Sequence, residues 1–490
     1  MSANRQRTIL LALAITAVLV IIRLVAAAML PFADTTEPRY AEIARLMAVS
    51  NDWITPWYQE GTPFWGKPPL SFWFQALSIK LLGTSELAIR LPALVMSVLT
   101  VLILVRYVRQ TQGTLMAVFA GLIYLSMALP FVSAGAVMTD TFLVFGTSFS
   151  IIGFLLHYQS QNRISPYYFY LGMAIGLLSK GPIAAIFCLT PILVAIITSP
   201  QQRSLIIEKL HWKKGLALLV LLVLPWYIMA EIKTPGFLNY FILGEHVYRY
   251  LDPGWQGDLY GSAHDRPRGT IWLYWIMASF PWGLLFLGIL LTRLRSLWEG
   301  KSGFNLTFED KVMVSSLLTP LIFFTAAGNI LWTYALPSLP FTALLIVKLW
   351  RSSNAKKVQR AQYIALVVPF TTVLLIALVI YGSIPLNSQK MLIAKALEEG
   401  QSMNSIYYLN KTPFSGRFYT NGNATTVDID SFRHQLDKSD DDLYLIIDNR
   451  QFSELGTLQG IHTELLMDNG SYSLYGITRM NTDSAQLSIR

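Results

Sequence analysis

Three carboxylates in the sequence are candidates for proton transfer. Asp34 directly precedes the segment 36–47, which has a threonine at a capping position, a proline in the first turn and an apolar face, as expected of a helix at a membrane interface. Asp34 could therefore act as a general base at the water–lipid boundary, or it could be a capping or solvated loop carboxylate. Glu37 is the second candidate, although an acid in a first helical turn also favours the helix dipole. Asp140 is the third.

Three cations are suited to binding a phosphate group. Lys67 stands in the run Trp65-Gly66-Lys67-Pro68-Pro69, where the two prolines restrict the backbone that carries it. Lys67 could instead be a lysine whose charged end reaches out of the membrane interface. Lys180 precedes a Gly-Pro pair, and Arg249 lies one helical turn after Glu245. The predicted substrate-binding residues are Arg39, Tyr40, Lys67, Lys180, Glu245, His246, Arg249, His264 and Tyr334.

The histidines give little support for a metal centre. His246 and His264 are 18 residues apart, and no carboxylate stands at a spacing that would make a clear third ligand. No cofactor is therefore predicted, and a divalent metal is an open alternative that the spacing does not support.

The composition places these residues in a membrane protein. Of 490 residues, 53% are apolar and 14% are charged, whereas soluble proteins have about 25% charged residues. The net charge is +9, but the cations form short clusters between apolar runs, which indicates membrane orientation before it indicates nucleic acid. Cys188 is the one cysteine, so an intramolecular disulfide is excluded.

Eleven apolar runs are expected to cross the membrane, and a total of about 11 to 13 transmembrane helices is predicted. The first run could be a signal peptide, but its length and the runs that follow favour an anchor. The predicted spans are about 8–30, 88–108, 113–132, 140–157, 166–180, 182–198, 214–231, 269–292, 312–328, 330–349 and 361–383.

Basic residues orient these spans. With the N-terminus in the cytoplasm, every inner loop contains lysine or arginine, whereas the short outer loops near 133–139 and 329 contain neither. The same orientation brings the candidate residues to the outer face, together with two long outer loops at 31–87 and 232–268. A membrane domain 1–387 is therefore predicted to act on a lipid phosphate at the outer surface.

The remainder of the chain is predicted to be a small soluble α/β domain at 388–490, on the periplasmic side. It has 9 basic and 13 acidic residues, so its net charge is −4 and differs in sign from that of the rest of the chain. Alternating apolar residues predict strands at 405–410, 417–421, 443–448, 463–466 and 472–477, with helices near 392–399 and 429–436.

These residues, in this order and at these depths, resemble the bacterial aminoarabinose transferases, within the protein O-mannosyltransferase-like group of GT-C glycosyltransferases. The resemblance covers roughly residues 8–350 and is strongest over 34–83. It implies a multi-pass enzyme of the bacterial inner membrane. Such an enzyme is expected to move a sugar, with inversion, from undecaprenyl phosphate or another polyprenyl phosphate to lipid A or another outer-face glycan or protein acceptor.

Two positions depart from the family pattern. Alignment on Arg39-Tyr40 matches Glu37 to the family's glutamate but places Thr36 where an aspartate is expected, and Gly66 stands where a glutamate precedes the Lys-Pro pair. The sugar and the acceptor therefore stay open. The alternative functions are a flippase or transporter of the same lipid-linked sugar and an oligosaccharide polymerase or ligase.

Overall fold

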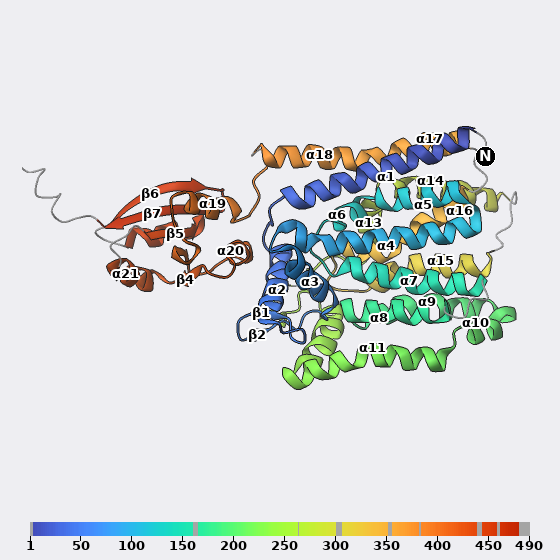
Figure 1. The fold of residues 1–490 in the computed structure, drawn as a ribbon. Helices are drawn as coiled ribbons and strands as arrows, with labels where there is room; N and C mark the ends of the chain where they lie inside the picture. The colour runs from blue at the N-terminus through green and yellow to red at the C-terminus, as the bar shows by residue number, and fades with distance from the viewer. Residues whose placement is uncertain are drawn as a thin grey trace, which may run out of the picture. The chain divides into compact units, whose positions relative to one another are not determined.

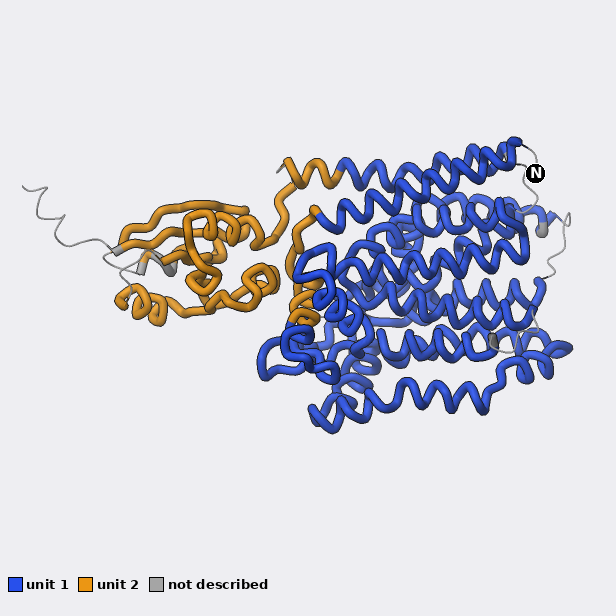
Figure 2. Tube along the Cα trace, viewed as in Figure 1, with its two compact units in different colours: residues 1–28, 46–374 blue, residues 29–45, 375–490 orange. Residues whose placement is uncertain are grey.

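The chain folds into two compact units. The structure, a computed structural model, describes residues 3–159, 165–262, 264–299, 306–350, 355–381, 384–438, 443–457 and 461–479. The first unit comprises residues 1–28 and 46–374, and the second comprises 29–45 and 375–490 (Figure 2). This division differs from the expected boundary at 387, because the second unit also includes residues 29–45.

The first unit is built from helices that run side by side (Figure 1). Its longer helices are α1 (Ala3–Met29), α4 (Glu86–Gln112), α7 (Asp140–Gln159), α9 (Ile183–Thr198), α11 (Trp212–Lys233), α14 (Trp282–Trp298), α15 (Phe308–Thr325) and α18 (Val367–Ile380). Its shorter helices are α3 (Leu70–Leu82), α5 (Thr114–Leu125), α6 (Ala128–Ser133), α8 (Tyr168–Lys180), α10 (Arg203–Lys209), α12 (Arg249–Leu251), α13 (Thr270–Ala278), α16 (Leu339–Leu349) and α17 (Ala355–Gln362).

Shorter elements connect these helices. Strands β1 (Trp57–Gln59) and β2 (Thr62–Pro63) form a hairpin before α3. The segment η3 (Asn239–Tyr248) is a π-helix, and 3-10 helices occupy Ser165–Tyr167, Pro200–Gln202, Trp332–Ser338 and Tyr363–Leu366.

The helices give a multi-span membrane protein but do not confirm the expected count of eleven spans. Six described helices are long and apolar enough to cross a membrane, or eight if each of two bent helix pairs is one span. The predicted span 113–132 is divided between α5 and α6, and α5 has 12 residues, or about 18 Å of helix, whereas a bilayer core is about 30 Å thick. The predicted span 269–292 is likewise divided, because α13 and the helix that follows it are bent by 111°.

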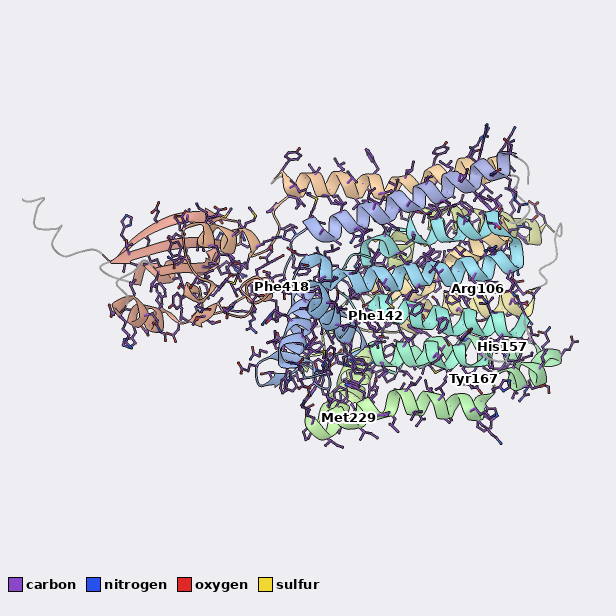
Figure 3. The ribbon with its side chains drawn as sticks, viewed as in Figure 1. Arg106, Phe142, His157, Tyr167, Met229 and Phe418 are labelled. Carbon is purple, nitrogen blue, oxygen red and sulfur yellow. The ribbon has the colours of Figure 1, made fainter. Side chains whose placement is uncertain are left out.

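Small residues allow close packing between helices of the first unit. A Cβ atom at Gly172 of α8 would lie 2.3 Å from the backbone nitrogen of Ser150 in α7, and the Ser150 hydroxyl donates to the Phe169 carbonyl at 2.8 Å. Small and hydroxyl-bearing residues are typical of helix contacts within membranes. Figure 3 places Arg106 and His157 at one end of α4 and α7, whereas Phe142 lies at the other end of α7.

The second unit contains a five-stranded sheet of order β4-β3-β5-β7-β6. The strands are β3 (Ile406–Leu409), β4 (Thr425–Val427), β5 (Leu443–Asp448), β6 (Ile461–Asp468) and β7 (Tyr472–Arg479), and the helices are α19 (Lys390–Glu398), α20 (Phe414–Tyr419) and α21 (Ile429–Lys438). Strands β4, β3 and β5 are parallel, and β7 is antiparallel to both β5 and β6.

Both faces of this sheet are covered by helices, which explains the almost continuous apolar sequence of β5. On one face, Leu445 and Ile447 pack in a cluster with Phe432 of α21. On the other face, Tyr444 and Ile446 share a cluster with Leu392 of α19.

One predicted strand is wrong. Residues 417–421 were expected to be extended, but most of them belong to the helix α20. A short apolar run does not distinguish the helical period from the strand period, and Phe414 and Phe418 lie one helical turn apart. The three-residue strand β4 was not expected. The other four predicted strands and both predicted helices correspond to β3, β5, β6, β7, α19 and α21.

Helix α2 (Thr36–Ser50) begins in the second unit and ends in the first. The residues expected on its apolar face are buried: Tyr40, Ile43, Ala44 and Met47. Helix α2 therefore carries the chain from the second unit into the first at a position close to Asp34, and α18 crosses the boundary at residues 374 and 375.

Candidate active site

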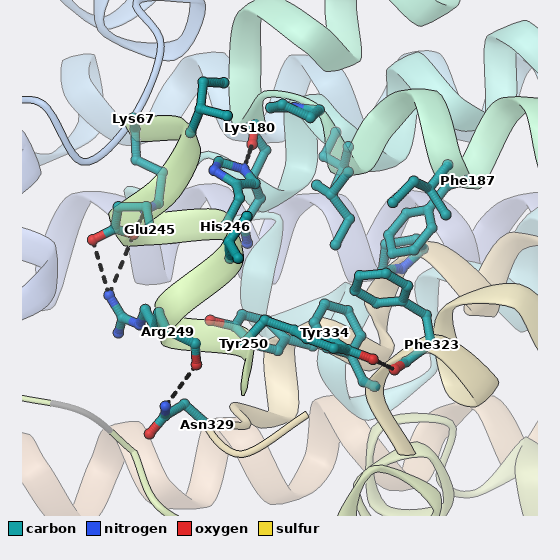
Figure 4. A pocket seen from close by; sticks show the side chains of 18 of the residues that line it. Lys67, Lys180, Phe187, Glu245, His246, Arg249, Tyr250, Phe323, Asn329 and Tyr334 are labelled. Carbon is teal, nitrogen blue, oxygen red and sulfur yellow. Dashed lines mark hydrogen bonds and ion pairs between the residues drawn. The ribbon is translucent and has the colours of Figure 1, made fainter. Parts of the chain in front are cut away.

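A cavity of about 420 Å³ in the first unit brings together residues from five separate parts of the sequence. Seven of the predicted site residues line it. All of them except Asp140 are labelled in Figure 4. The seven are Lys67, Asp140, Lys180, Glu245, His246, Arg249 and Tyr334.

Two cations meet one buried carboxylate at the first side of the cavity. The Lys67 Nζ atom lies 3.1 Å from Glu245 Oε2, and Arg249 Nη1 lies 3.2 Å from Glu245 Oε1 and 3.1 Å from Asp258 Oδ2. The side chain of Glu245 is only 6% exposed. These pairs hold an ammonium and a guanidinium group at the cavity wall, where a phosphate could accept hydrogen bonds from both.

The ion pairs also determine the charge of Glu245. Burial raises the pKa of this carboxyl, but the positive charges of Lys67 and Arg249 and the hydrogen bond from Lys67 outweigh burial and leave the pKa below its ordinary value. Glu245 is therefore ionised at neutral pH, and its lowered pKa makes it a weak proton acceptor. It is better suited to positioning the two cations.

A third cation, Lys180, lies at the second side of the cavity. Its ammonium group is hydrogen-bonded to the Asp140 carboxylate and lies 5.1 Å from the centre of the Tyr334 ring. Lys180 ends α8 and Asp140 begins α7, so each charge is placed at the helix end that favours it. Asp140 is buried and supplies a second carboxylate to the cavity.

His246 joins the two sides through backbone carbonyl groups. Its Nδ1 atom lies 2.7 Å from the Phe241 oxygen, and its Nε2 atom lies 3.1 Å from the Lys180 oxygen. Burial lowers the pKa of this imidazole, although both carbonyl oxygens favour the protonated ring. With both ring nitrogens occupied, His246 is suited to bracing the site.

The cavity supplies no metal centre from its own side chains. Among the described residues, no group of three or more histidine, cysteine, aspartate or glutamate side chains could hold a metal ion.

The rest of the cavity wall is apolar and was not predicted. Ile183, Phe187, Phe323 and Phe324 line it, and the hydroxyl of Tyr250 donates to the Phe323 carbonyl at 2.7 Å. The cavity thus combines a charged part with an apolar part, as a lipid phosphate would require. Aromatic residues inside apolar runs gave no separate signal, because they are also typical of ordinary membrane helices.

Asn329 was not predicted as a site residue either. Its position, as a polar residue in a short loop between apolar runs, could have indicated it. Its Nδ2 atom donates to the carbonyl oxygens of Arg249 and Asp252, at 2.7 and 2.8 Å. Asn329 therefore fixes the backbone that carries Arg249. The ion pair of Arg249 with Asp258 was also missed.

Five predicted site residues do not line the cavity. Asp34, Glu37, Arg39 and Tyr40 belong to the second unit, where the Asp34 carboxylate accepts hydrogen bonds from Ser415 and the Arg39 guanidinium lies 5.3 Å from the Tyr40 ring centre. His264 is exposed in a loop of the first unit, and its carbonyl oxygen accepts from the Ile330 amide at 3.0 Å.

Comparison with known proteins shows what the chain resembles. Residues 66–229 match the family described as dolichyl-phosphate-mannose-protein mannosyltransferase. The chain is 27% identical, over 324 residues, to the undecaprenyl phosphate-alpha-4-amino-4-deoxy-L-arabinose arabinosyl transferase of Aeromonas salmonicida. The chain is thus similar in sequence to the aminoarabinose transferases. The predicted resemblance to this family, and to the GT-C glycosyltransferases, is confirmed.

Each match covers only part of the two chains. The Aeromonas match covers 64% of this chain and 55% of the relative, so the chain spans about half the length of that transferase. The transferase of Yersinia pestis is also 27% identical, over 63% of this chain and 54% of its own length.

Two solved structures share the fold of this chain. ArnT from Cupriavidus metallidurans bound to undecaprenyl phosphate has a TM-score of 0.75 and 17% identity, over 95% of this chain and 97% of that one. The Archaeoglobus fulgidus oligosaccharyltransferase in the apo form has a TM-score of 0.51 and 13% identity, over 90% and 70% of the chains.

Proposed function

We propose that the protein transfers a sugar from a polyprenyl phosphate carrier, such as undecaprenyl phosphate, to an acceptor at the outer face of the bacterial inner membrane. The observation that carries this proposal is the cavity itself, in which Lys67, Lys180 and Arg249 lie beside an apolar wall. A polyprenyl phosphate has the same two parts, an anionic headgroup and an apolar chain. The names of the curated relatives support the same reaction class.

In the proposed reaction, an acceptor oxygen attacks the anomeric carbon while the bond from that carbon to the carrier phosphate breaks. The leaving phosphate gains negative charge, which the three cations are placed to stabilise. A single displacement of this kind inverts the anomeric carbon.

The proton of an acceptor hydroxyl needs a base. Asp140 is the proposed base within the cavity, because it is paired with one cation, Lys180, whereas Glu245 is paired with both Lys67 and Arg249. If the acceptor is instead a phosphate, which is ionised near neutral pH, Asp140 serves to position Lys180. Glu37, at the start of α2, is the second carboxylate that we propose to act on the acceptor.

The proposed acceptors are lipid A, another envelope glycan or a protein. Gly66 replaces a glutamate of the family pattern next to Lys67, so a carboxylate that could recognise a sugar amine is absent at that position. We therefore propose the transfer of a polyprenyl-linked sugar and leave aminoarabinose as one candidate among pentoses and hexoses.

Mass spectrometry of cells tests this function. Membrane lipids and envelope glycans from cells with the chain should contain a sugar modification that is missing both from cells without it and from cells with Lys67→Ala. An accumulation of the sugar on its carrier should accompany the loss. Identical glycans and lipids in all three strains would contradict the proposal.

A further inference from the structure

The segment that precedes α2 is fixed to helix α20 within the second unit. Phe32 is fully buried, and its ring lies 4.9 Å from that of Phe418 in an edge-to-face arrangement. The backbone amide of Phe32 donates to the Tyr419 hydroxyl at 2.7 Å. Residues 387 positions apart in the sequence are thus joined by packing and by a hydrogen bond.

Asp34 completes this connection. Its carboxylate accepts the Ser415 backbone amide at 3.1 Å and also the Ser415 hydroxyl, and its own amide donates to the Asn387 carbonyl at 2.8 Å. Ser415 is fully buried and Asp34 is half-buried. The Ser415 amide lies in the first turn of α20, where it lacks a carbonyl partner within the helix, so the Asp34 carboxylate supplies that partner.

We propose that Asp34 is a positioning residue, which fixes the start of α2 to Ser415, and that it is not the proton acceptor of the reaction. Each oxygen of this carboxylate accepts a hydrogen bond from the buried residue Ser415. The carboxylate is therefore oriented toward α20, and a substrate hydroxyl would have to compete with Ser415 for it. The start of α2 carries Glu37, Arg39 and Tyr40, so the pairing fixes the position of these side chains. This inference rests on the proposed sugar transfer.

Substitutions at Asp34 distinguish positioning from base catalysis. In Asp34→Asn the amide oxygen can still accept the Ser415 N–H, and the amide NH₂ can donate to the Ser415 hydroxyl. The connection is thus retained while the basic group is lost. In Asp34→Ala both are lost, and Ser415→Ala removes one of the two donors without touching the carboxylate.

The test measures sugar transfer by the full-length chain in reconstituted membranes, together with hydrogen exchange of α20. We expect Asp34→Asn to keep kcat/KM within about threefold of the wild type and to leave the acid limb of its pH profile in place. Asp34→Ala should lower kcat/KM about tenfold or more and accelerate exchange at Ser415. Ser415→Ala should lie between them, and the double variant should be no worse than Asp34→Ala alone.

Thr426→Val is the matched control, because it removes a hydroxyl of the same unit that is bonded to Thr412 and should change neither measurement. A loss of about 10²-fold or more in Asp34→Asn, with slow exchange of α20, would overturn the proposal in favour of base catalysis. Full activity of Asp34→Ala, with fast exchange at Ser415, would also overturn it. If the wild type itself transfers no sugar, the proposed function is wrong. If hydrogen exchange at Ser415 is unchanged in Asp34→Ala, the proposed pairing of Asp34 with Ser415 is wrong.

Discussion

Lys67 and Arg249 share the carboxylate of Glu245, and both face the cavity. We expect Lys67→Ala or Arg249→Ala to weaken the binding of undecaprenyl phosphate by about 10- to 100-fold. Hydrogen bonds to charged groups contribute roughly 1.5–3 kcal/mol, and about 1.4 kcal/mol corresponds to a tenfold change. Titration of the purified protein with the lipid measures this effect.

Lys213→Ala is the control for these variants, because Lys213 is an exposed lysine at the start of α11. It should bind the lipid as the wild type does. Equal binding by all three variants would exclude the cavity as the carrier site.

The pKa of Glu245 makes a separate prediction about pH. Because this pKa is lower in the folded protein, the ionised carboxylate stabilises the fold above its unfolded pKa of about 4.3. That contribution is lost as the pH falls through the still lower folded value. The difference in melting temperature between the wild type and Glu245→Gln should be constant from about pH 8 to 5 and should shrink below about pH 4. A difference that already shrinks near pH 7 would contradict the direction of the pKa shift.

Single residues were predictable from sequence where the residue type and its predicted membrane depth together indicate a function. Lys67, Lys180 and Arg249 stand out because they are cations at the predicted outer face. The contact of Asp34 was not predictable, because Ser415 lies 381 residues away and is an ordinary serine in the sequence. Burial between distant segments decides whether a loop carboxylate is available for chemistry, and a sequence pattern does not report it.

At the scale of elements, Gly181 determines how closely α8 approaches η3. Its φ is +83°, and a Cβ atom there would lie 2.5 Å from the Phe241 ring and 3.1 Å from His246 Nε2. Gly181→Ala should therefore destabilise the protein by about 1–3 kcal/mol and displace His246 from the Lys180 carbonyl. Thermal unfolding measures the first effect, and lipid titration should show weaker carrier binding.

Gly400→Ala is a useful comparison for this variant. Gly400 also has a positive φ, of +85°, but no atom lies within 4 Å of the position of its Cβ. Gly400→Ala should destabilise the protein through backbone strain and should leave carrier binding unchanged. If Gly181→Ala binds the lipid as tightly as Gly400→Ala does, the close approach of α8 and η3 does not shape the site.

Helices and strands were predictable where the length of an apolar run and the spacing of its apolar residues indicate the same type of element. The run 88–108 lies within α4, and the short apolar run 443–448 is β5. The break between α5 and α6 was not predictable from hydropathy, because both pieces are apolar. Likewise, the π-helical form of η3 has no sequence signal, although it carries Glu245 and His246.

At the scale of the whole molecule, we predict eleven spans with a cytoplasmic N-terminus. Reporter enzymes fused after residues 205 and 300 should then be active in the cytoplasm, and one fused after residue 490 should be active in the periplasm. The physical reason is the concentration of lysine and arginine in the predicted inner loops. A cytoplasmic signal at 490 would mean an even number of crossings and would place the α/β sheet on the opposite side from the proposed reaction.

Transfer by the purified protein is the most direct test of the account. The chain, reconstituted in liposomes with a radiolabelled sugar on undecaprenyl phosphate and an extract of envelope acceptors, should move label from the carrier to an acceptor. Lys67→Ala should abolish this movement, and Lys213→Ala should not. Movement of the intact labelled lipid across the bilayer, without any transfer of its sugar, would contradict the account and identify the protein as a flippase.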